Sequence, residues 1–154
     1  MPHFRLDSEP SAAGDELQSE YFVARRHGVQ ALRAVRRLGE RISPHLHIAE
    51  IRTTAADELW LSPAFERDSL CIGFTWRQHP AAVAALLPVI EDVLAPFQPR
   101  PHWGKLFGFR AAELAPRFPR LPDFLDVRAR YDPTGKFCNP FLNQILGTAN
   151  HPMA

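Results

Sequence analysis

Lys105 is the side chain whose neighbours first suggest chemistry. It lies in residues 99–107, a stretch that also contains His102, Trp103, two prolines and a glycine. A lysine beside a histidine and a tryptophan, entered from a stiff turn, indicates a positive charge aimed at a defined place. The plainer interpretation is an edge strand whose lysine faces water.

Glu50 and Arg52 form a second polar pair upstream. Two residues apart on a strand, their side chains would leave the same face about 6.6 Å apart. The pair is either a surface ion pair or a carboxylate and a guanidinium that grip a hydroxyl-bearing substrate. Thr75 would add a hydroxyl from a neighbouring strand, with Gly73 leaving room for a ligand, although threonine is also an ordinary strand former.

Other chemistries have weaker support. His45 and His47 have a spacing that could chelate a metal, but no further ligands accompany them, so we expect no metal. The net charge of +1 favours a solvated helix face, and no nucleic-acid partner, for the arginines between residues 25 and 37. The chain has no phosphate loop and no dinucleotide fingerprint.

The composition is that of one globular domain with a real core. The chain has 154 residues, of which 45% are hydrophobic and 23% charged. Its two cysteines, Cys71 and Cys138, lie far apart in no metal-like spacing, which predicts reduced thiols and a cytoplasmic protein. We expect no apolar run of transmembrane length, no membrane span and no signal peptide.

Hydrophobic periodicity predicts strands at residues 17–24, 45–52, 70–76 and 102–107. Helices are predicted at 27–42 and 81–94, the second kinked or split at Pro88. The order β-α-β-β-α-β predicts an α+β, ferredoxin-like antiparallel sheet with both helices on one face. Short helices should follow at 111–115, 122–131 and 140–146. The predicted organisation is an irregular lead-in at 1–16, the sheet domain at 17–110, and a helical extension of the same domain at 111–154.

Alternation also predicts the faces of the sheet. Leu70, Ile72, Phe74 and Trp76 should face the helices. The opposite face should carry Thr75 together with the 45–52 strand's Leu46, Ile48, Glu50 and Arg52. A sheet face that leaves leucine and isoleucine bare predicts a cover, which could be another domain, a subunit or a ligand.

Several segments together resemble one enzyme family. They are LQSEYF at 17–22, EIRT at 50–53, DELWLSP at 57–63, FTW at 74–76, RPHWGK at 100–105, and DP through FCNPF at 132–141. In order and spacing they resemble the C-terminal part of alditol (xylitol) oxidases. These are FAD-linked enzymes of the vanillyl-alcohol-oxidase superfamily, related to sugar-1,4-lactone oxidases such as arabinono- and gulonolactone oxidase. One departure is Gly73, where the family usually has histidine.

The resemblance implies a cap or substrate domain whose sheet roofs a flavin. The FAD would be bound mainly by a domain missing from this chain, which would act in cis or in trans. Glu50, Arg52, Thr75 and Lys105 would line the pocket for a polyol or sugar lactone, with His102 near the cofactor.

Arg52, Lys105 and Glu50 would then be catalytic in the oxidation of a terminal hydroxyl, with oxygen reduced to hydrogen peroxide. The fragment alone, a truncated or split gene product, would be inactive. The alternative is a non-catalytic ferredoxin-like module that binds a partner or small ligand.

Overall fold

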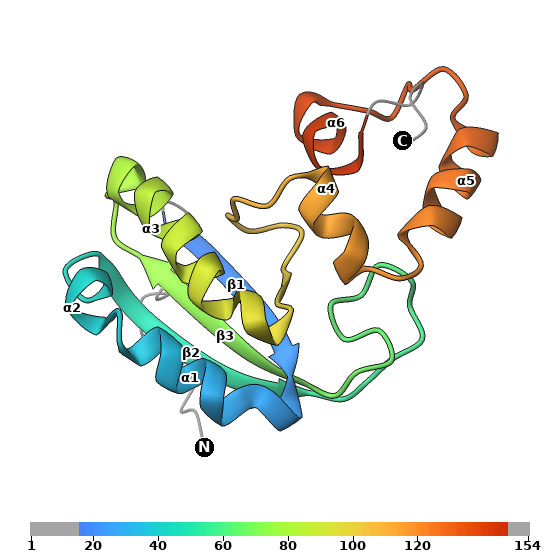
Figure 1. The fold of residues 1–154 in the computed structure, drawn as a ribbon. Coiled ribbons are helices and arrows are strands. Elements are labelled where there is room, and N and C mark those ends of the chain that lie inside the picture. Colours follow the sequence, from blue (N-terminus) through green and yellow to red (C-terminus); the bar gives the residue numbers. More distant parts are fainter. Residues whose placement is uncertain (1–15, 148–154) are drawn as a thin grey trace, which may run out of the picture.

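A four-stranded antiparallel sheet organises the part of the chain that the computed structural model describes, residues 16–147. Its strands are β1 (Leu17–Ala24), β2 (Leu46–Thr54), β3 (Ser69–Trp76) and β4 (Arg100–Pro101). They lie in the order β2-β3-β1-β4; Figure 1 shows β2, β3 and β1 side by side. With the helices between them, this is the ferredoxin-like β-α-β-β-α-β arrangement, and the predicted α+β class is confirmed. The predicted lead-in falls outside the described residues, except for Glu16.

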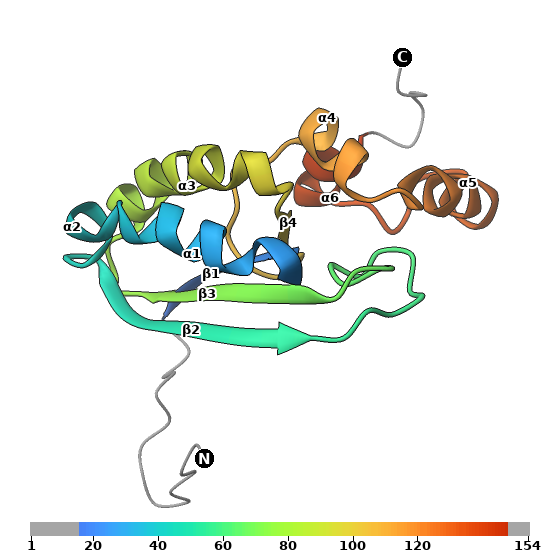
Figure 2. The same ribbon diagram turned by 60° about the horizontal axis from the view of Figure 1, so that its bottom comes forward.

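Two helical segments cover one face of the sheet (Figure 2). The first consists of a 3₁₀ turn η1 (Arg25–His27), α1 (Gly28–Arg36) and α2 (Gly39–Ile42); the second is α3 (Pro80–Leu94), followed by η2 (Ala95–Phe97). The single helix predicted at 27–42 is therefore wrong. Leu38 N bonds Val35 O in a tight turn, and Gly39, a poor helix former, begins the next piece.

Helix α3 is continuous through Pro88, so the predicted split does not occur. With η2 it forms the stretch Pro80–Phe97, which is long and apolar enough to cross a membrane by length and composition. The expectation that no apolar run reaches this length is therefore wrong. Core helices meet the same criterion, and the apolar face of α3 joins the core through Val83, Leu86, Leu87, Ile90 and Leu94.

The sheet faces follow the predicted alternation on β3. Ile72, Phe74 and Trp76 are buried against the helices, and Leu70 packs on the same core. On β2 a bulge at His47 shifts the register, so that Leu46 pairs with Trp76 while Ile48 pairs with Thr75. The bulge turns Leu46 to the helix-covered face, contrary to the prediction, because an extra residue reverses the alternation beyond it.

The face opposite the helices, called the open face below, is bare only in part. On β2, Ile48, Glu50 and Arg52 are all substantially exposed. On the two central strands, by contrast, Phe22 and Thr75 also lie on this face and are buried. The apolar exposure inferred from sequence is therefore confined to the edge strand.

The fourth strand differs most from expectation. It was predicted at 102–107, but β4 comprises only Arg100 and Pro101, opposite Phe22 and Tyr21 of β1. The chain then makes a turn, with Lys105 N bonded to His102 O, before Leu106 N bonds Gln18 O of β1. Gly104 inside the segment permits the turn, and strand-like pairing is interrupted there.

Short helices complete the chain: α4 (Ala111–Leu114), the 3₁₀ turn η3 (Ala115–Arg117), α5 (Leu121–Tyr131) and α6 (Pro140–Leu146). They agree closely with the predicted pieces. Asn139 caps α6, its Oδ1 accepting from Leu142 N at 2.8 Å. Leu114, Phe118, Leu121, Ile145 and Leu146 belong to the same apolar cluster as the sheet and its helices.

Candidate functional site

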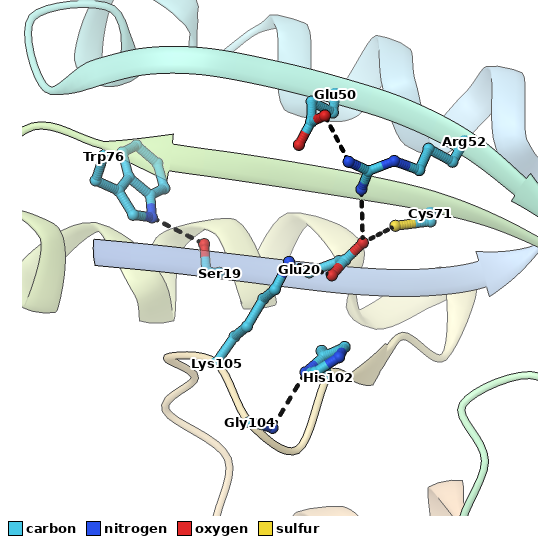
Figure 3. A network of polar contacts seen from close by, with 9 residues as sticks. All are labelled: Ser19, Glu20, Glu50, Arg52, Cys71, Trp76, His102, Gly104 and Lys105. Atoms are coloured by element: carbon cyan, nitrogen blue, oxygen red, sulfur yellow. Dashed lines mark hydrogen bonds and ion pairs between the residues drawn. The ribbon is translucent and has the colours of Figure 1, made fainter. Parts of the chain in front are cut away.

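Glu20 is at the centre of the polar groups on the open face (Figure 3). Its neighbour Tyr21 points to the helices, so alternation along β1 sends Glu20 to the opposite face. The carboxylate side chain is only 7% exposed. A buried charge of this kind needs partners, and Glu20 has three.

Lys105 is the first partner. Its Nζ lies 2.5 Å from Glu20 Oε2. The turn that carries Lys105 is tied to β1 before and after, by His102 N to Glu20 O at 2.9 Å and by Leu106 N to Gln18 O at 2.8 Å.

Trp103 anchors the turn from the other side. The indole Nε1 donates to Leu61 O at 2.7 Å, and the ring packs on Phe118 with centroids 4.5 Å apart. With both ends bonded and the tryptophan held, the lysine is aimed at a defined place, as the sequence suggested.

Arg52 is the second partner. Its Nη1 lies 3.3 Å from Glu20 Oε1, and its Nη2 donates to Glu50 Oε1 at 2.5 Å. The Arg52 side chain is 50% exposed and that of Glu50 43%, so their guanidinium and carboxylate stand at the rim. The predicted pair on β2 therefore does form an ion pair, and that pair is linked through Glu20 to Lys105.

Cys71 is the third partner. Its thiol donates to Glu20 Oε1 at 2.6 Å from the adjacent strand β3. Burial, followed by the hydrogen bond to Glu20 and the charge of that carboxylate, raises the pKa of Cys71 to about 12. The residue is thus a neutral thiol at physiological pH, a hydrogen-bond donor and not a nucleophile.

Two opposing effects, burial and nearby hydrogen bonds and charges, set the pKa of Glu20. Burial raises the pKa of its carboxyl, but hydrogen bonds from Cys71 and Lys105, with the charges of Lys105 and His102, outweigh this and leave the pKa below its usual value. Glu20 is therefore ionised at neutral pH.

Burial lowers the pKa of Arg52, but the nearby Glu50 and Glu20 carboxylates outweigh it and raise that pKa overall. The result is two cations held beside two anions.

The remaining candidates lie near this cluster without bonding to it. Thr75 is buried on the open face, paired with Gln18 on one side and Ile48 on the other. His102 is half-buried, and its Nδ1 accepts from Gly104 N within its own turn at 3.1 Å. The structure thus brings Glu50, Arg52 and Lys105 together and leaves Thr75 and His102 at the margin.

Sequence reasoning missed Glu20 and Cys71 as members of the site. The available signal was the position of Glu20 within the predicted strand 17–24, directly before the apolar run 21–24, since a charge that is buried in a strand must be paired. Cys71 carried no comparable signal, because a cysteine in a strand packs as a small apolar residue.

One histidine of the pair whose spacing could have chelated a metal, His45, contacts a third histidine. Nδ1 of His45 lies 2.9 Å from Nδ1 of His79, at the surface where β2 begins. Within residues 16–147, no group of three or more histidine, cysteine, aspartate or glutamate side chains is placed to hold a metal ion.

Comparison with known families decides what kind of chain carries this cluster. Residues 15–145 match the model of the D-arabinono-1,4-lactone oxidase family, which covers most of the chain and all four strands. The chain belongs to the D-arabinono-1,4-lactone oxidase family. The resemblance seen in the sequence motifs is thereby confirmed.

Relatives of this family member include an alditol oxidase from a Streptomyces species, 46% identical over 146 residues, which are 95% of the chain and 35% of that protein. The L-gulono-1,4-lactone dehydrogenase of Mycobacterium tuberculosis is 33% identical over 131 residues, 84% of the chain and 30% of that protein. The L-gulonolactone oxidase of Mus musculus is 32% identical over 100 residues, which are 63% of the chain and 23% of that protein. The chain thus spans about a third or less of the length of each.

Proposed function

We propose that this chain is the substrate-binding part of an FAD-dependent oxidase that oxidises a terminal hydroxyl of an alditol, or a sugar lactone, and reduces oxygen to hydrogen peroxide. The observation that carries the proposal is the pair of cations, Arg52 and Lys105, held by the buried Glu20 on the open face of the sheet. Family membership and the names of the relatives support the class of substrate.

The exposed charges at the rim of the open face suit a flavin placed beside them. Gly73, buried opposite Glu20 on one side and Glu50 on the other, has no side chain, and a Cβ built there would meet Glu50 and Arg52 only at 3.6 Å or more. Arg52 is half exposed and Lys105 partly exposed, so both cations can act on an electron-rich ring at this rim, with His102 at the turn. We place the FAD-binding domain outside these 154 residues, in cis or in trans. When bound, FAD would accept the hydride from the alcohol carbon.

The chain's own groups then have distinct tasks. Glu50 stands at the rim, where its carboxylate can accept hydrogen bonds from substrate hydroxyls and orient them. Lys105 and Arg52 stabilise negative charge on the substrate oxygen as its proton passes to solvent water. Glu20 holds both cations in place and offsets their mutual repulsion.

A chimera tests the proposal. The region of the Streptomyces alditol oxidase that aligns with this chain would be replaced by residues 15–145, and the purified protein checked for bound FAD. We expect xylitol-dependent oxygen consumption with hydrogen peroxide formed in equal amount, and the same assay with L-gulono-1,4-lactone would rank the two substrate classes. A chimera that binds FAD stoichiometrically but consumes no oxygen with either compound would contradict the proposal and favour a non-catalytic module.

A further inference from the structure

A second polar site lies at the other end of β1, where the strand passes into η1 and α1. A cavity of about 420 Å³ opens there, and its charged lining residues are Arg26, Arg67, Arg100 and Glu66. A neighbouring hollow of about 610 Å³ shares Arg26, Glu66 and Arg67. The proposed oxidase chemistry uses none of these residues.

The positive charge of this cavity is only partly compensated. Three arginines line it against one carboxylate, that of Glu66; the charge of Asp57 also acts on Arg100, and Asp68 lines the neighbouring hollow. Within residues 16–147 the ion pairs shorter than 4.0 Å involve other cations, namely Arg52, Lys105 and Arg120. Like charges brought together without counter-ions destabilise a fold, and a bound anion would relieve that cost.

Arg67 shows the effect of this uncompensated charge most clearly. Burial, and then the charges of Arg100 and Arg26, lower its pKa to about 10. Its Nη1 donates to Gln98 O at 3.1 Å and its Nη2 to Phe22 O at 2.9 Å, so the guanidinium is fixed in place. The third donor, Nε, is buried and has no acceptor. A buried N–H without a partner is uncommon and costly.

The backbone around the cavity is also unusual. Among the described residues, two that are not glycine have positive φ, Glu66 at 50° and Gln98 at 49°. Both line this cavity. Such conformations are unfavourable for residues with a side chain and persist where the surroundings require them. The rings of His27 and Phe97, which also line the cavity, lie 6.3 Å apart and offer aromatic surface.

We propose that this cavity binds a small phosphate-bearing molecule. Arginine forks match phosphate oxygens, and the cavity is large enough for an organic group beside the phosphate, against His27 and Phe97. Arg67 and Arg100 are held by backbone carbonyls, and Arg26 is the exposed member that completes the site, its Nε donating to His27 Nε2 at 3.1 Å. The inference is independent of the proposed oxidase activity.

Titration of the purified chain with inorganic phosphate, AMP and adenosine tests the site, at constant ionic strength. The reporter is the side-chain Nε–H resonance of Arg67 in ¹⁵N-labelled protein. We expect phosphate and AMP to shift it saturably, AMP with the lower Kd, and adenosine to leave it unchanged at the same concentrations. An unmoved Arg67 signal, or equal shifts with adenosine, would overturn the proposal.

Two matched variants complete the experiment. Arg26→Gln should weaken AMP binding about tenfold, the effect of one lost charge-assisted hydrogen bond. Arg36→Gln removes the same charge from an exposed position on α1 outside the cavity and should leave the Kd unchanged. Equal weakening in both variants would show mere charge attraction and refute a site. A poly-glutamate peptide that shifted Arg67 at lower concentration than AMP would reassign the cavity to acidic peptides.

Discussion

Glu20 determines how the other charges of the open face behave. A lone lysine or arginine on a strand is a flexible surface cation, whereas here both cations converge on one carboxylate that is almost fully buried. Charges fixed in this way before substrate arrives need no rearrangement when negative charge develops, which is the property that preorganised sites exploit. Glu20 lies inside one of the family motifs but was not predicted as a site residue, and it is the one on which the proposed catalytic pair depends.

Replacing Lys105 should mainly affect turnover. In the chimera, Lys105→Ala should lower kcat about a hundredfold, or about 3 kcal/mol, with little change in KM, because charge on the substrate oxygen grows only toward the transition state. Steady-state oxygen consumption gives both constants. Lys136→Ala, which removes the chain's other lysine from an exposed position, serves as the control. Unchanged turnover in Lys105→Ala would reduce the lysine to a structural partner of Glu20.

Replacing Glu20 should change how stability depends on pH. The pKa of Glu20 is lowered in the fold, so its contribution is present above the usual glutamate value of about 4.3 and is lost as pH falls through the lowered one. Glu20→Gln should therefore cost about 2 kcal/mol at pH 7, the magnitude of a hydrogen bond to a charged group. Urea unfolding between pH 7 and pH 2.5 should show the gap to wild type closing in acid. A constant gap would mean that the carboxylate's charge does not matter.

Among the elements, those with strong alternation were the predictable ones. On β3, Leu70, Ile72, Phe74 and Trp76 mark the core face unambiguously, and their position was confirmed. The bulge at His47 was not predictable, because no residue type signals which position of an edge strand gains an extra residue.

The candidate site was likewise predictable only in part. Glu50 and Arg52 share a face because of their spacing alone, whereas Lys105 reaches them through a turn, and Glu20 joins them through pairing between distant strands. Register across a sheet depends on long-range packing, which a single sequence does not display.

Pro88 interrupts the hydrogen bonding of α3 without ending the helix. It is exposed and has no N–H to offer Ala84 O, so Pro88→Ala should restore one helical bond and leave no cavity. We expect a gain of about 2 kcal/mol in the free energy of unfolding, reduced somewhat by the greater freedom of the unfolded chain. Pro80→Ala is the control, since proline suits the first turn of a helix and its removal should bring no gain. Equal changes in the two variants would contradict this reasoning.

At the scale of the whole molecule, one buried carboxylate joins three parts. Glu91 Oε1 on α3 accepts from Tyr21 Oη of the sheet at 2.8 Å and from Gly108 N at 2.7 Å. Gly108 begins the segment that leads to the C-terminal helices, and a Cβ there would lie 2.7 Å from Glu91 Oε2. A side chain at this position would displace the Glu91 carboxylate from its hydrogen bonds, and the contact between Glu91 and Gly108 helps to hold the C-terminal helices against the sheet domain.

Glu91 should have the opposite pH dependence from Glu20. Burial, the largest effect, raises its pKa, so the folded state holds a proton that the unfolded state releases, and stability is lost as pH rises from about 4.3 through the raised value. Glu91→Gln should abolish this loss and unfold at an equal or higher temperature than wild type at pH 7. Calorimetric scans from pH 4 to pH 7 measure it, with Asp92→Asn on the exposed side of α3 as control. A large destabilisation of Glu91→Gln at pH 7 would show that the ionised form is the stabilising one.

The number of residues in the turn between His102 and Leu106 determines where the Lys105 ammonium lies. On β2 or β3, one inserted residue would reverse every side chain beyond it and destroy a face. In the turn, both flanking bonds to β1 are made outside the bend, at His102 N and Leu106 N, and Trp103 is anchored at its start. Residues added or removed between Trp103 and Leu106 would therefore change chiefly how far the ammonium of Lys105 reaches, while the sheet stays intact. On the proposed function, this segment is the place to redesign specificity.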